Sequence, residues 1–325
     1  MKAIRMHAKG GPGELVYEDA PKPTLQAGDA LVRVHACAIT YTELSWTETY
    51  TNHDGTERLP TIPGHELSGV VEAVAPDLAD TMVGEAVYAL SDFSRDGAAA
   101  EYVAVRAADL APKPPRLTHV EASAVPLAAL TAWQALFDHG GLTKGQTVLI
   151  HGATGGVGSF AVQLAHWRGA RVIGTASAGN VGLAHQLGAD EVIDYTTVRF
   201  EDQVRDVDVV LDTVGGETQE RSWAVLRRGG VLVTIVGSLP AEKAARYGVD
   251  GVFFIVTPSR AELIEIGRLI GDSQLRPIIG AIFPLDKARE AFERGAGGHN
   301  RGKIVLQVTA EAAARRDAQV PERAA

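Results

Sequence analysis

Two hydrophobic patterns follow one another along this chain. Up to about residue 110, short segments such as LVRVHACAI (residues 31–39) alternate apolar and polar positions, as half-buried strands do. Glycine and proline interrupt these segments often, at KGGPGE, PKP, QAGD and LPTIPG. Short strands with such frequent turn signals predict a compact, barrel-like β domain.

From about residue 121 the pattern changes to apolar strands that alternate with helices. The segment EASAVPLAALTAWQALFDHG has helical spacing and ends at a pair of glycines, which stops a helix. Continuous apolar runs predict strands at TVLIHGA, RVIGTA, EVIDY, VDVVLDTVG and GVLVTIVG. Such strands, with helices between them, indicate a parallel sheet covered on both faces, and this region extends to about residue 260. Beyond it we predict a helix at RAELIEIGRLIGDSQL, a strand at RGKIVLQV that could return to the first domain, and a disordered tail.

The strongest motif is VLIHGATGGVGSFAVQLA, in which a strand ends near His151 and a helix begins near Gly156. Ala153, Gly155 and Gly158 occupy the three small-residue positions of the dinucleotide fingerprint. They permit a tight turn, a close approach of the backbone to a pyrophosphate, and close packing of the helix on the strand. The free N–H groups at the helix start favour phosphate. We therefore predict cofactor contacts along the whole turn, against the alternative of a merely flexible turn: Ala153, Thr154, Gly155, Gly156, Val157 and Gly158.

The end of the next strand predicts which dinucleotide is bound. NAD-binding proteins carry an acidic residue about 20 positions after the turn, on the ribose hydroxyls. The segment GTASAGN (residues 174–180) has no Asp or Glu there, and a carboxylate would repel a 2′-phosphate. Ser177 and Asn180 could donate hydrogen bonds to that phosphate, or they could simply cap the next helix. We predict NADP (as NADPH) over NAD, although the turn itself has no Lys or Arg.

Composition narrows the class of protein. A length of 325 residues favours two domains, and 46% hydrophobic with 22% charged residues is typical of a globular protein. A net charge of −9 argues against nucleic acid as the main partner. The single cysteine, Cys37, leaves no internal disulfide and no Cys-rich zinc site. The N-terminal segment has no long apolar run and no stretch approaches ~18 apolar residues, so we expect no membrane anchor and a cytoplasmic location.

Eight stretches, in this order and spacing, resemble the medium-chain dehydrogenase/reductase superfamily and, within it, the zinc-independent quinone oxidoreductase (zeta-crystallin-like) branch. They cover about residues 1–308: IPGHELSGVVEAV, PLAALTAWQAL, VLIHGATGGVGSFAVQLA, GARVIGTAS, LGADEVIDY, VDVVLDTVGG, RRGGVLVTIVG and RGKIVL. The resemblance implies an α/β fold, in which a Rossmann doubly wound parallel sheet is joined to a GroES-like β-barrel catalytic domain. It implies a catalytic domain at 1–122 completed by 262–310, a Rossmann domain at 123–261, and a tail at 311–325. It also implies NADPH-dependent reduction of quinones or α,β-unsaturated carbonyls, usually by homodimers.

The resemblance further implies cofactor contacts outside the glycine turn. Thr131 matches a threonine near the nicotinamide, and Tyr195 matches a tyrosine at the adenosine phosphate of NADPH. Ser177 matches the 2′-phosphate region, although the basic residue often found shortly after it is absent here. The remaining matches are the strand end at Val236 and Gly237, the segment Phe254, Ile255 and Val256, and the late polar residue Asn300.

The stretch IPGHELSG carries the His–Glu pair that zinc-dependent relatives use together with a cysteine. The position of that cysteine is Thr40 here, and Cys37 lies three residues earlier on an alternating strand, facing the other way. His65 and Glu66 alone supply too few ligands for catalytic zinc. We predict no metal, with His65 a hydrogen-bonded turn residue and Glu66 orienting a neighbouring backbone group or arginine.

Loss of zinc changes the chemistry that fits. Alcohol oxidation needs a stabilised alkoxide, whereas hydride addition to a quinone or enone spreads its charge over an enolate that hydrogen-bond donors can hold. The segment TYTELSWTETY offers such donors, and we predict Thr40 and Tyr41 as catalytic residues. Ser45, Trp46 and Tyr50 are predicted to contact the substrate, with ordinary packing as the alternative for the two aromatic residues. Two other functions stay open: a zinc-type alcohol dehydrogenase, and a catalytically silent nucleotide-binding protein on the same scaffold.

Overall fold

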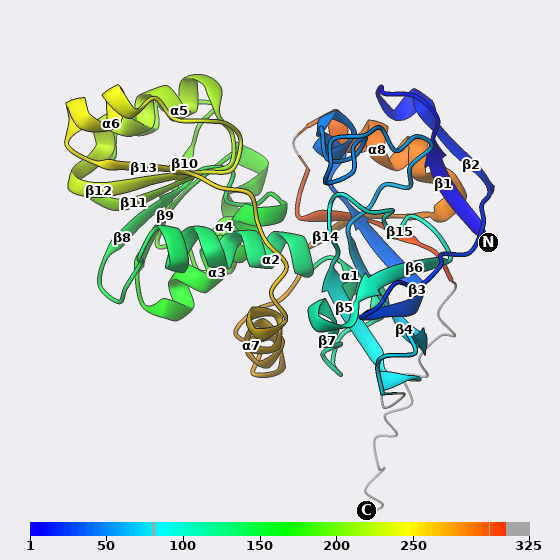
Figure 1. Ribbon diagram of the computed structural model, residues 1–325. Coiled ribbons are helices and arrows are strands. Elements are labelled where there is room, and N and C mark those ends of the chain that lie inside the picture. The colour runs from blue at the N-terminus through cyan, green and yellow to red at the C-terminus, as the bar shows by residue number, and fades with distance from the viewer. Residues whose placement is uncertain (80–81, 299, 310–325) are drawn as a thin grey trace, which may run out of the picture.

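Two β-sheets, one in each lobe of the molecule, organise the chain (Figure 1). The computed structural model describes residues 1–79, 82–298 and 300–309. The first sheet contains residues from both ends of this range, and the second contains residues from its middle. The predicted tail at 311–325 lies outside the described residues.

The first sheet is antiparallel over most of its width. Among the described residues its strand order is β14-β15-β3-β4-β5-β7, with β6 also paired to β3. The bounds are β3 Asp29–Ile39, β4 Glu66–Val74, β5 Ala86–Leu90, β6 Tyr102–Arg106, β7 Ala111–Pro112, β14 Ile279–Pro284 and β15 Lys303–Gln307. A separate antiparallel pair is formed by β1 Lys2–Met6 and β2 Leu15–Asp19. Because β15 pairs antiparallel with β3, the chain returns to the first domain at RGKIVLQV, as expected.

Helix α8 (Ala288–Ala296) covers the core of this lobe. Its buried Phe292 packs in one hydrophobic cluster with Ile4 and Met6 of β1 and with Leu306 of β15. The first and last described segments are therefore held together by a shared apolar core.

The second sheet is fully parallel. Its strand order in the described part of the chain is β10-β9-β8-β11-β12-β13, which is the doubly wound order of dinucleotide-binding folds. The strands are β8 Thr147–Ile150, β9 Arg171–Ala176, β10 Glu191–Asp194, β11 Val207–Asp212, β12 Leu226–Thr234 and β13 Asp250–Phe253. The helices around it are α2 Pro126–Trp133, α3 Gly156–Arg168, α4 Val181–Gln186, α5 Gly216–Ser222, α6 Ala241–Tyr247 and α7 Arg260–Gly271.

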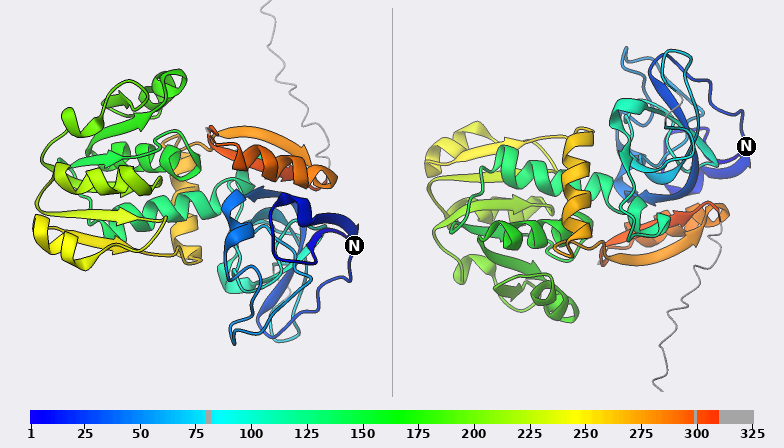
Figure 2. Two further views of the ribbon diagram at one scale, coloured as in Figure 1. Left: turned by 90° about the horizontal axis from the view of Figure 1, so that it is seen from above. Right: turned by 90° about the horizontal axis from the view of Figure 1, so that it is seen from below.

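Both faces of this sheet are buried, and Figure 2 shows helices on either side of it. Along β8, Val148 and Ile150 belong to one core cluster and the intervening Leu149 belongs to another. A strand that is covered on both faces has no polar face, which explains the continuous apolar runs in the sequence.

The structure corrects the prediction of one helix at 121–140. Helix α1 (His119–Ser123) ends before Pro126, and α2 then begins with that proline as its first residue. Proline lacks an N–H group and suits the first turn of a helix better than its interior. The segment continues as a π-helical turn, Gln134–His139.

Strands β13 and β14 and helix α8 were not predicted, and the domain boundaries stay predictions. Within the residues described, no helix is both long enough and apolar enough to cross a bilayer.

Candidate active site

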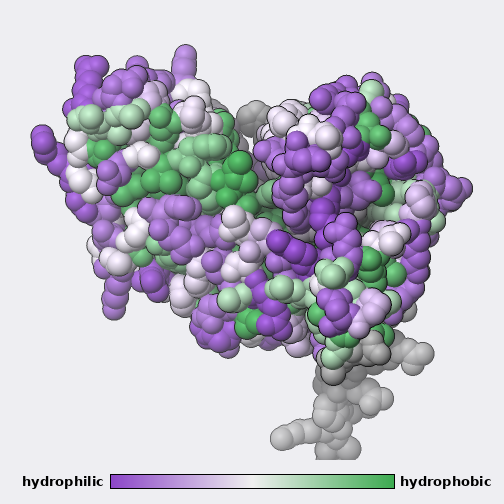
Figure 3. Space-filling view, in the orientation of Figure 1, coloured by the Kyte–Doolittle hydropathy of each residue, from purple (hydrophilic) through white to green (hydrophobic). Residues whose placement is uncertain are grey.

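A cavity of about 930 Å³ lies between the two lobes, and residues of both line it. One end is formed by the loops that follow the parallel strands, and the other by the segment after β3. In Figure 3, hydrophobic residues gather on the lobe that carries β13, beside the junction of the lobes. Phe253, at the end of β13, and Ile255 just after it both line the cavity and are 44% and 59% exposed, which is unusual for such large apolar side chains.

The glycine-rich turn after β8 forms the floor of the cavity. Helix α3 begins at Gly156, as predicted, and its amide-rich first turn borders the cavity. A Cβ on Gly158 would lie 2.1 Å from the backbone oxygen of Gly152, so only glycine permits this close approach of helix and turn. Gly152 itself has a φ of +66°, a left-handed conformation that the fingerprint alone did not reveal.

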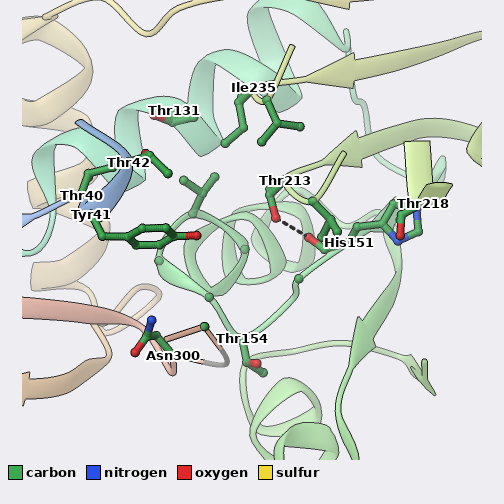
Figure 4. A pocket seen from close by; sticks show the side chains of 18 of the residues that line it. Thr40, Tyr41, Thr42, Thr131, His151, Thr154, Thr213, Thr218, Ile235 and Asn300 are labelled. Carbon is green, nitrogen blue, oxygen red and sulfur yellow. Dashed lines mark hydrogen bonds between the residues drawn. The ribbon is translucent and has the colours of Figure 1, made fainter. Parts of the chain in front are cut away.

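The segment before β15 crosses to the other domain at this turn. Gly302 donates a backbone hydrogen bond of 2.9 Å to the carbonyl of Thr154, and Gly155 and Gly302 form an isolated parallel bridge. Asn300 lines the cavity nearby (Figure 4). Its amide donates to the Gly295 carbonyl at 2.8 Å. The two domains therefore meet at the place where the motif predicts a pyrophosphate.

Ser177 and Asn180 both line the cavity at the end of β9. Neither side chain caps the following helix; instead the Asn180 amide donates to the Ser177 hydroxyl at 3.0 Å. Arg301, which the sequence reasoning missed, donates to the side chain of Asn180 and to the Gly179 carbonyl at 2.6 Å. Arg301 therefore places a cation from the segment before β15 against the loop that follows β9, although it is not among the residues that line the cavity.

Tyr195 and Arg199 border the same end of the cavity. Tyr195 follows β10, and its side chain is 47% exposed. Arg199 forms an ion pair of 2.7 Å with Glu201. The loop of residues 174–180 has no acid of its own, but the carboxylate of Asp194 interacts with the backbone of Ala178, and Glu201 offsets the charge of Arg199.

Most of the residues that were predicted to contact the nicotinamide part of the cofactor line the cavity: Thr131, Val236, Phe254, Ile255 and Val256. The predicted Ala153 and Gly237 do not. Ala153 is fully buried beneath the turn. Its Cβ packs against Gly174, where an added Cβ would lie only 2.8 Å away from it. It makes room for the turn rather than contacting the contents of the cavity.

The far end of the cavity is built by the segment that follows β3. Thr40, Tyr41, Ser45 and Trp46 line it, as does Phe93, whose ring meets Trp46 edge to face at 5.4 Å. Figure 4 shows the Tyr41 ring extending into the cavity, with Thr131 on one side and Asn300 on the other. The hydroxyl and aromatic residues of TYTELSW therefore share one surface.

The prediction that Tyr50 contacts the substrate is wrong. Tyr50 is only 4% exposed, packs in the core of the first lobe, and donates its hydroxyl proton to the Leu44 carbonyl at 2.5 Å. Alternation in the sequence could not tell this interior position from a cavity wall.

A buried polar cluster lies behind Thr40. Lys303, at the start of β15, pairs with Glu66 of β4, and its ammonium donates to the Thr40 hydroxyl at 3.2 Å. Glu66 also accepts a 3.2 Å hydrogen bond from the Leu127 amide at the start of α2. The expectation that Glu66 orients a backbone group is confirmed, but its charged partner is a lysine of the last strand rather than an arginine.

Glu43 and His65 complete this cluster. Glu43 accepts from the backbone amide of Gly64, and its carboxylate lies 3.8 Å from Nδ1 of His65. Burial raises the pKa of Glu43 to about 7, although Gly64 and Lys303 act against the rise, and burial lowers the pKa of His65 to about 4. Burial also raises the pKa of Glu66, and Lys303 opposes that rise.

The residues present do not fit a catalytic zinc ion. Nε2 of His65 donates to the Arg95 carbonyl at 3.2 Å, so this nitrogen has no lone pair for a metal, and Nδ1 lies 3.8 Å from the buried Glu43 carboxylate. Glu66 is paired with Lys303, and Thr40 stands where a cysteine would be needed. Cys37 is buried in the core of the β domain, as predicted. In the part of the chain that the structure describes, no group of three or more His, Cys, Asp or Glu residues is arranged to hold a metal.

The residues do fit a bound dinucleotide, because the turn is open to the cavity and its glycines allow backbone approach. Comparison with known proteins agrees with this. Residues 26–115 match a family described as alcohol dehydrogenase GroES-like domain, and residues 187–306 match one described as zinc-binding dehydrogenase.

Individual proteins resemble most of the chain. A protein of Arthroderma benhamiae named "Probable zinc-binding oxidoreductase, mitochondrial" is 35% identical over 89% of this chain and 91% of its own. The solved structure of a quinone oxidoreductase from Coxiella burnetii has a TM-score of 0.88 and 32% identity, and covers 95% of this chain and 99% of that one. A mycobacterial protein solved in complex with NADPH has a TM-score of 0.82 and 28% identity, over 95% and 100% of the two chains.

Proposed function

Because the chain belongs to the medium-chain dehydrogenase/reductase superfamily and is an oxidoreductase of the quinone oxidoreductase type, we propose that it reduces quinones or α,β-unsaturated carbonyls with NADPH and without zinc. One observation carries the proposal: a single cavity joins the glycine turn, Gly152–Gly158, to the hydroxyl and aromatic residues that follow β3. A cofactor held at the turn and an acceptor held at Trp46 would therefore share one cavity.

Binding of NADPH would use both domains. The first turn of α3 offers backbone N–H groups to a pyrophosphate, and the Gly302 segment closes over it from the catalytic domain. Ser177, Asn180 and Arg301 are proposed to receive the 2′-phosphate, since this loop carries no acid that would repel it. When bound, NADPH would supply the hydride, and Thr131, Val236 and Ile255 border the part of the cavity toward which its reactive end would point.

The acceptor end suits a flat, neutral molecule. Trp46, Phe93 and Tyr41 give it an apolar and aromatic surface, and Glu48 at its border would disfavour an anionic acceptor. Because the donor set does not fit zinc, oxygen that gains negative charge must be stabilised by side-chain hydrogen-bond donors, and Thr40 and Tyr41 lie at this end.

Two expectations complete the proposal. We propose a homodimer, for which β13 at the edge of the parallel sheet offers a backbone edge and exposed apolar neighbours; light scattering tests it. We also propose a cytoplasmic location, although the relative from Arthroderma benhamiae is named mitochondrial, and cell fractionation tests that.

The central experiment follows NADPH absorbance with benzoquinones, naphthoquinones, and cyclic and open-chain enones, on protein whose metal content is measured. We expect turnover with at least one class at far less than one zinc per chain. Tightly bound zinc with alcohol oxidation would favour the dehydrogenase alternative. Cofactor binding without turnover on any acceptor would favour a catalytically silent nucleotide-binding protein.

A further inference from the structure

We infer that Lys303, held by Glu66, orients the hydroxyl proton of Thr40 toward the cavity, which makes Thr40 the donor to the acceptor's oxygen. This inference rests on the proposed function and adds a positioning residue that lies 263 positions from Thr40 in the chain. It follows from a comparison of the groups to which the hydroxyls at this end of the cavity donate their protons.

The ammonium group of Lys303 determines the direction of the hydrogen bond. An ammonium has three donors and no acceptor, so in the 3.2 Å contact the Thr40 oxygen must accept. The proton of Thr40 must therefore point elsewhere. In residues 1–79, 82–298 and 300–309, no hydrogen bond donated by the Thr40 hydroxyl is found, and Thr40 lines the cavity.

Neighbouring hydroxyls are arranged differently. Thr131 donates its proton to the Leu127 carbonyl at 2.6 Å, and Ser45 donates to the Thr42 carbonyl at 2.7 Å. Both protons are already engaged by the backbone, so neither hydroxyl is free to donate to the acceptor. Tyr41 and Thr42 are the competitors that remain at this end, because both line the cavity; the Tyr41 ring extends into it, and Tyr41 is 46% exposed.

Lys303 is itself rigidly placed. Its side chain is 7% exposed, its ammonium pairs with Glu66, and its stem packs against the start of α3, where a Cβ on Gly156 would lie 3.0 Å from its Cδ. Glu66 is anchored in turn by the Leu127 amide. The ion pair keeps a cation beside Thr40 without leaving an uncompensated buried charge, which would be costly.

The reaction step balances as follows. Hydride adds to the electron-poor carbon of the acceptor, and the π electron pair moves onto the acceptor's oxygen. That oxygen takes the proton of Thr40 while Lys303 transfers one of its own protons to the Thr40 oxygen. The neutral lysine amine then recovers a proton from water, so that one proton from solvent is consumed for each hydride. A hydroxyl whose oxygen already accepts from a cation is a stronger donor than a free one.

Isosteric and conservative variants test this at saturating NADPH, with the best acceptor found for the wild type. We expect Thr40→Val to lower kcat about 100-fold and Thr40→Ser to retain most of it, since general-acid assistance is worth about 10² or more. Lys303→Met should lower kcat at least about tenfold, and Lys303→Arg should recover part of the loss. The Kd of NADPH for the Thr40 variants, measured by fluorescence, should stay within about twofold of the wild type. The exposed Lys22, which pairs with Glu72 at 2.7 Å, provides a matched control in Lys22→Met.

A second readout needs no turnover. The anion of 4-nitrophenol resembles an enolate, and its bound fraction can be followed by phenolate absorbance. With oxidised cofactor present, the wild type should favour the phenolate over the neutral phenol, and Thr40→Val and Lys303→Met should lose that preference. The inference would be overturned if Thr40→Val and Lys303→Met both kept nearly the wild-type kcat and the preference for the phenolate. It would also be overturned if Tyr41→Phe were the one variant that lost both the kcat and the preference. A wild type inactive on every acceptor would instead refute the proposed function.

Discussion

Replacing Gly158 by alanine tests whether the turn and α3 must touch backbone to backbone. The new Cβ would lie 2.1 Å from the Gly152 oxygen, 2.8 Å from its carbonyl carbon and 3.0 Å from the Ala153 Cα. All three neighbours are main-chain atoms, so no side chain can rotate away and the helix start must shift.

The magnitude follows from two opposing effects. Overpacking of this kind costs about 1–3 kcal/mol, and alanine in place of glycine in a helix returns up to about 1 kcal/mol. We therefore expect a net loss of about 1–2 kcal/mol in the free energy of unfolding. The displaced turn should also weaken NADPH binding at least about tenfold, which corresponds to about 1.4 kcal/mol.

Gly182 of α4 is the matched control. It is also a helical glycine, but a Cβ there would meet no atom within 4 Å. Gly182→Ala should leave NADPH affinity unchanged and keep or slightly raise stability. Urea unfolding and fluorescence titration measure both quantities. If Gly158→Ala matched Gly182→Ala in stability and in Kd, the packing argument for the turn would be refuted.

Three further predictions concern single side chains. Since the folded-state pKa of Glu43 is raised from 4.5 to about 7, the folded protein holds this proton more tightly than the unfolded chain, and stability falls as pH rises through that interval. His65, Glu66 and Lys303 are present in both the wild type and Glu43→Gln, so their titration affects both proteins alike. Between pH 4.5 and 7, the free energy of unfolding of the wild type, measured in urea, should fall by about 3 kcal/mol more than that of Glu43→Gln. Equal changes with pH in the two proteins would contradict this. Tyr50→Ala should destabilise the fold by about 3–5 kcal/mol yet leave the acceptor KM unchanged at low temperature, whereas a raised KM would return Tyr50 to the binding surface. Arg301→Gln should raise the Kd of NADPH about tenfold more than that of NADH in paired titrations, and an equal effect on both would place the 2′-phosphate elsewhere.

The parts of this protein that were predictable from sequence are those that depend on short-range pattern. The glycine turn, the start of α3 and the acid-free end of β9 each lie within a few consecutive residues, and their backbone requirements appear directly as residue types. The parallel sheet was equally accessible, because burial on both faces leaves continuous apolar runs.

What escaped prediction depends on contacts between distant segments. Asn300 was predicted from its motif, but the adjacent Arg301 and the nearby Lys303 acquire their roles only through partners more than 100 residues away. Tyr50 failed for the same reason, since its interior position is decided by packing against β1 and α8. In the GHE segment, sequence showed that zinc ligands were missing, yet only the fold showed the ion pair that stands behind Thr40.

The most direct test of the account is turnover by protein that has been treated with chelator and then analysed for metal. The account predicts that NADPH oxidation by a quinone or enone proceeds at an undiminished rate with less than about one zinc ion per ten chains, because a hydroxyl held by Lys303 stabilises the developing charge. Activity that disappears with the metal and returns on addition of zinc would contradict it.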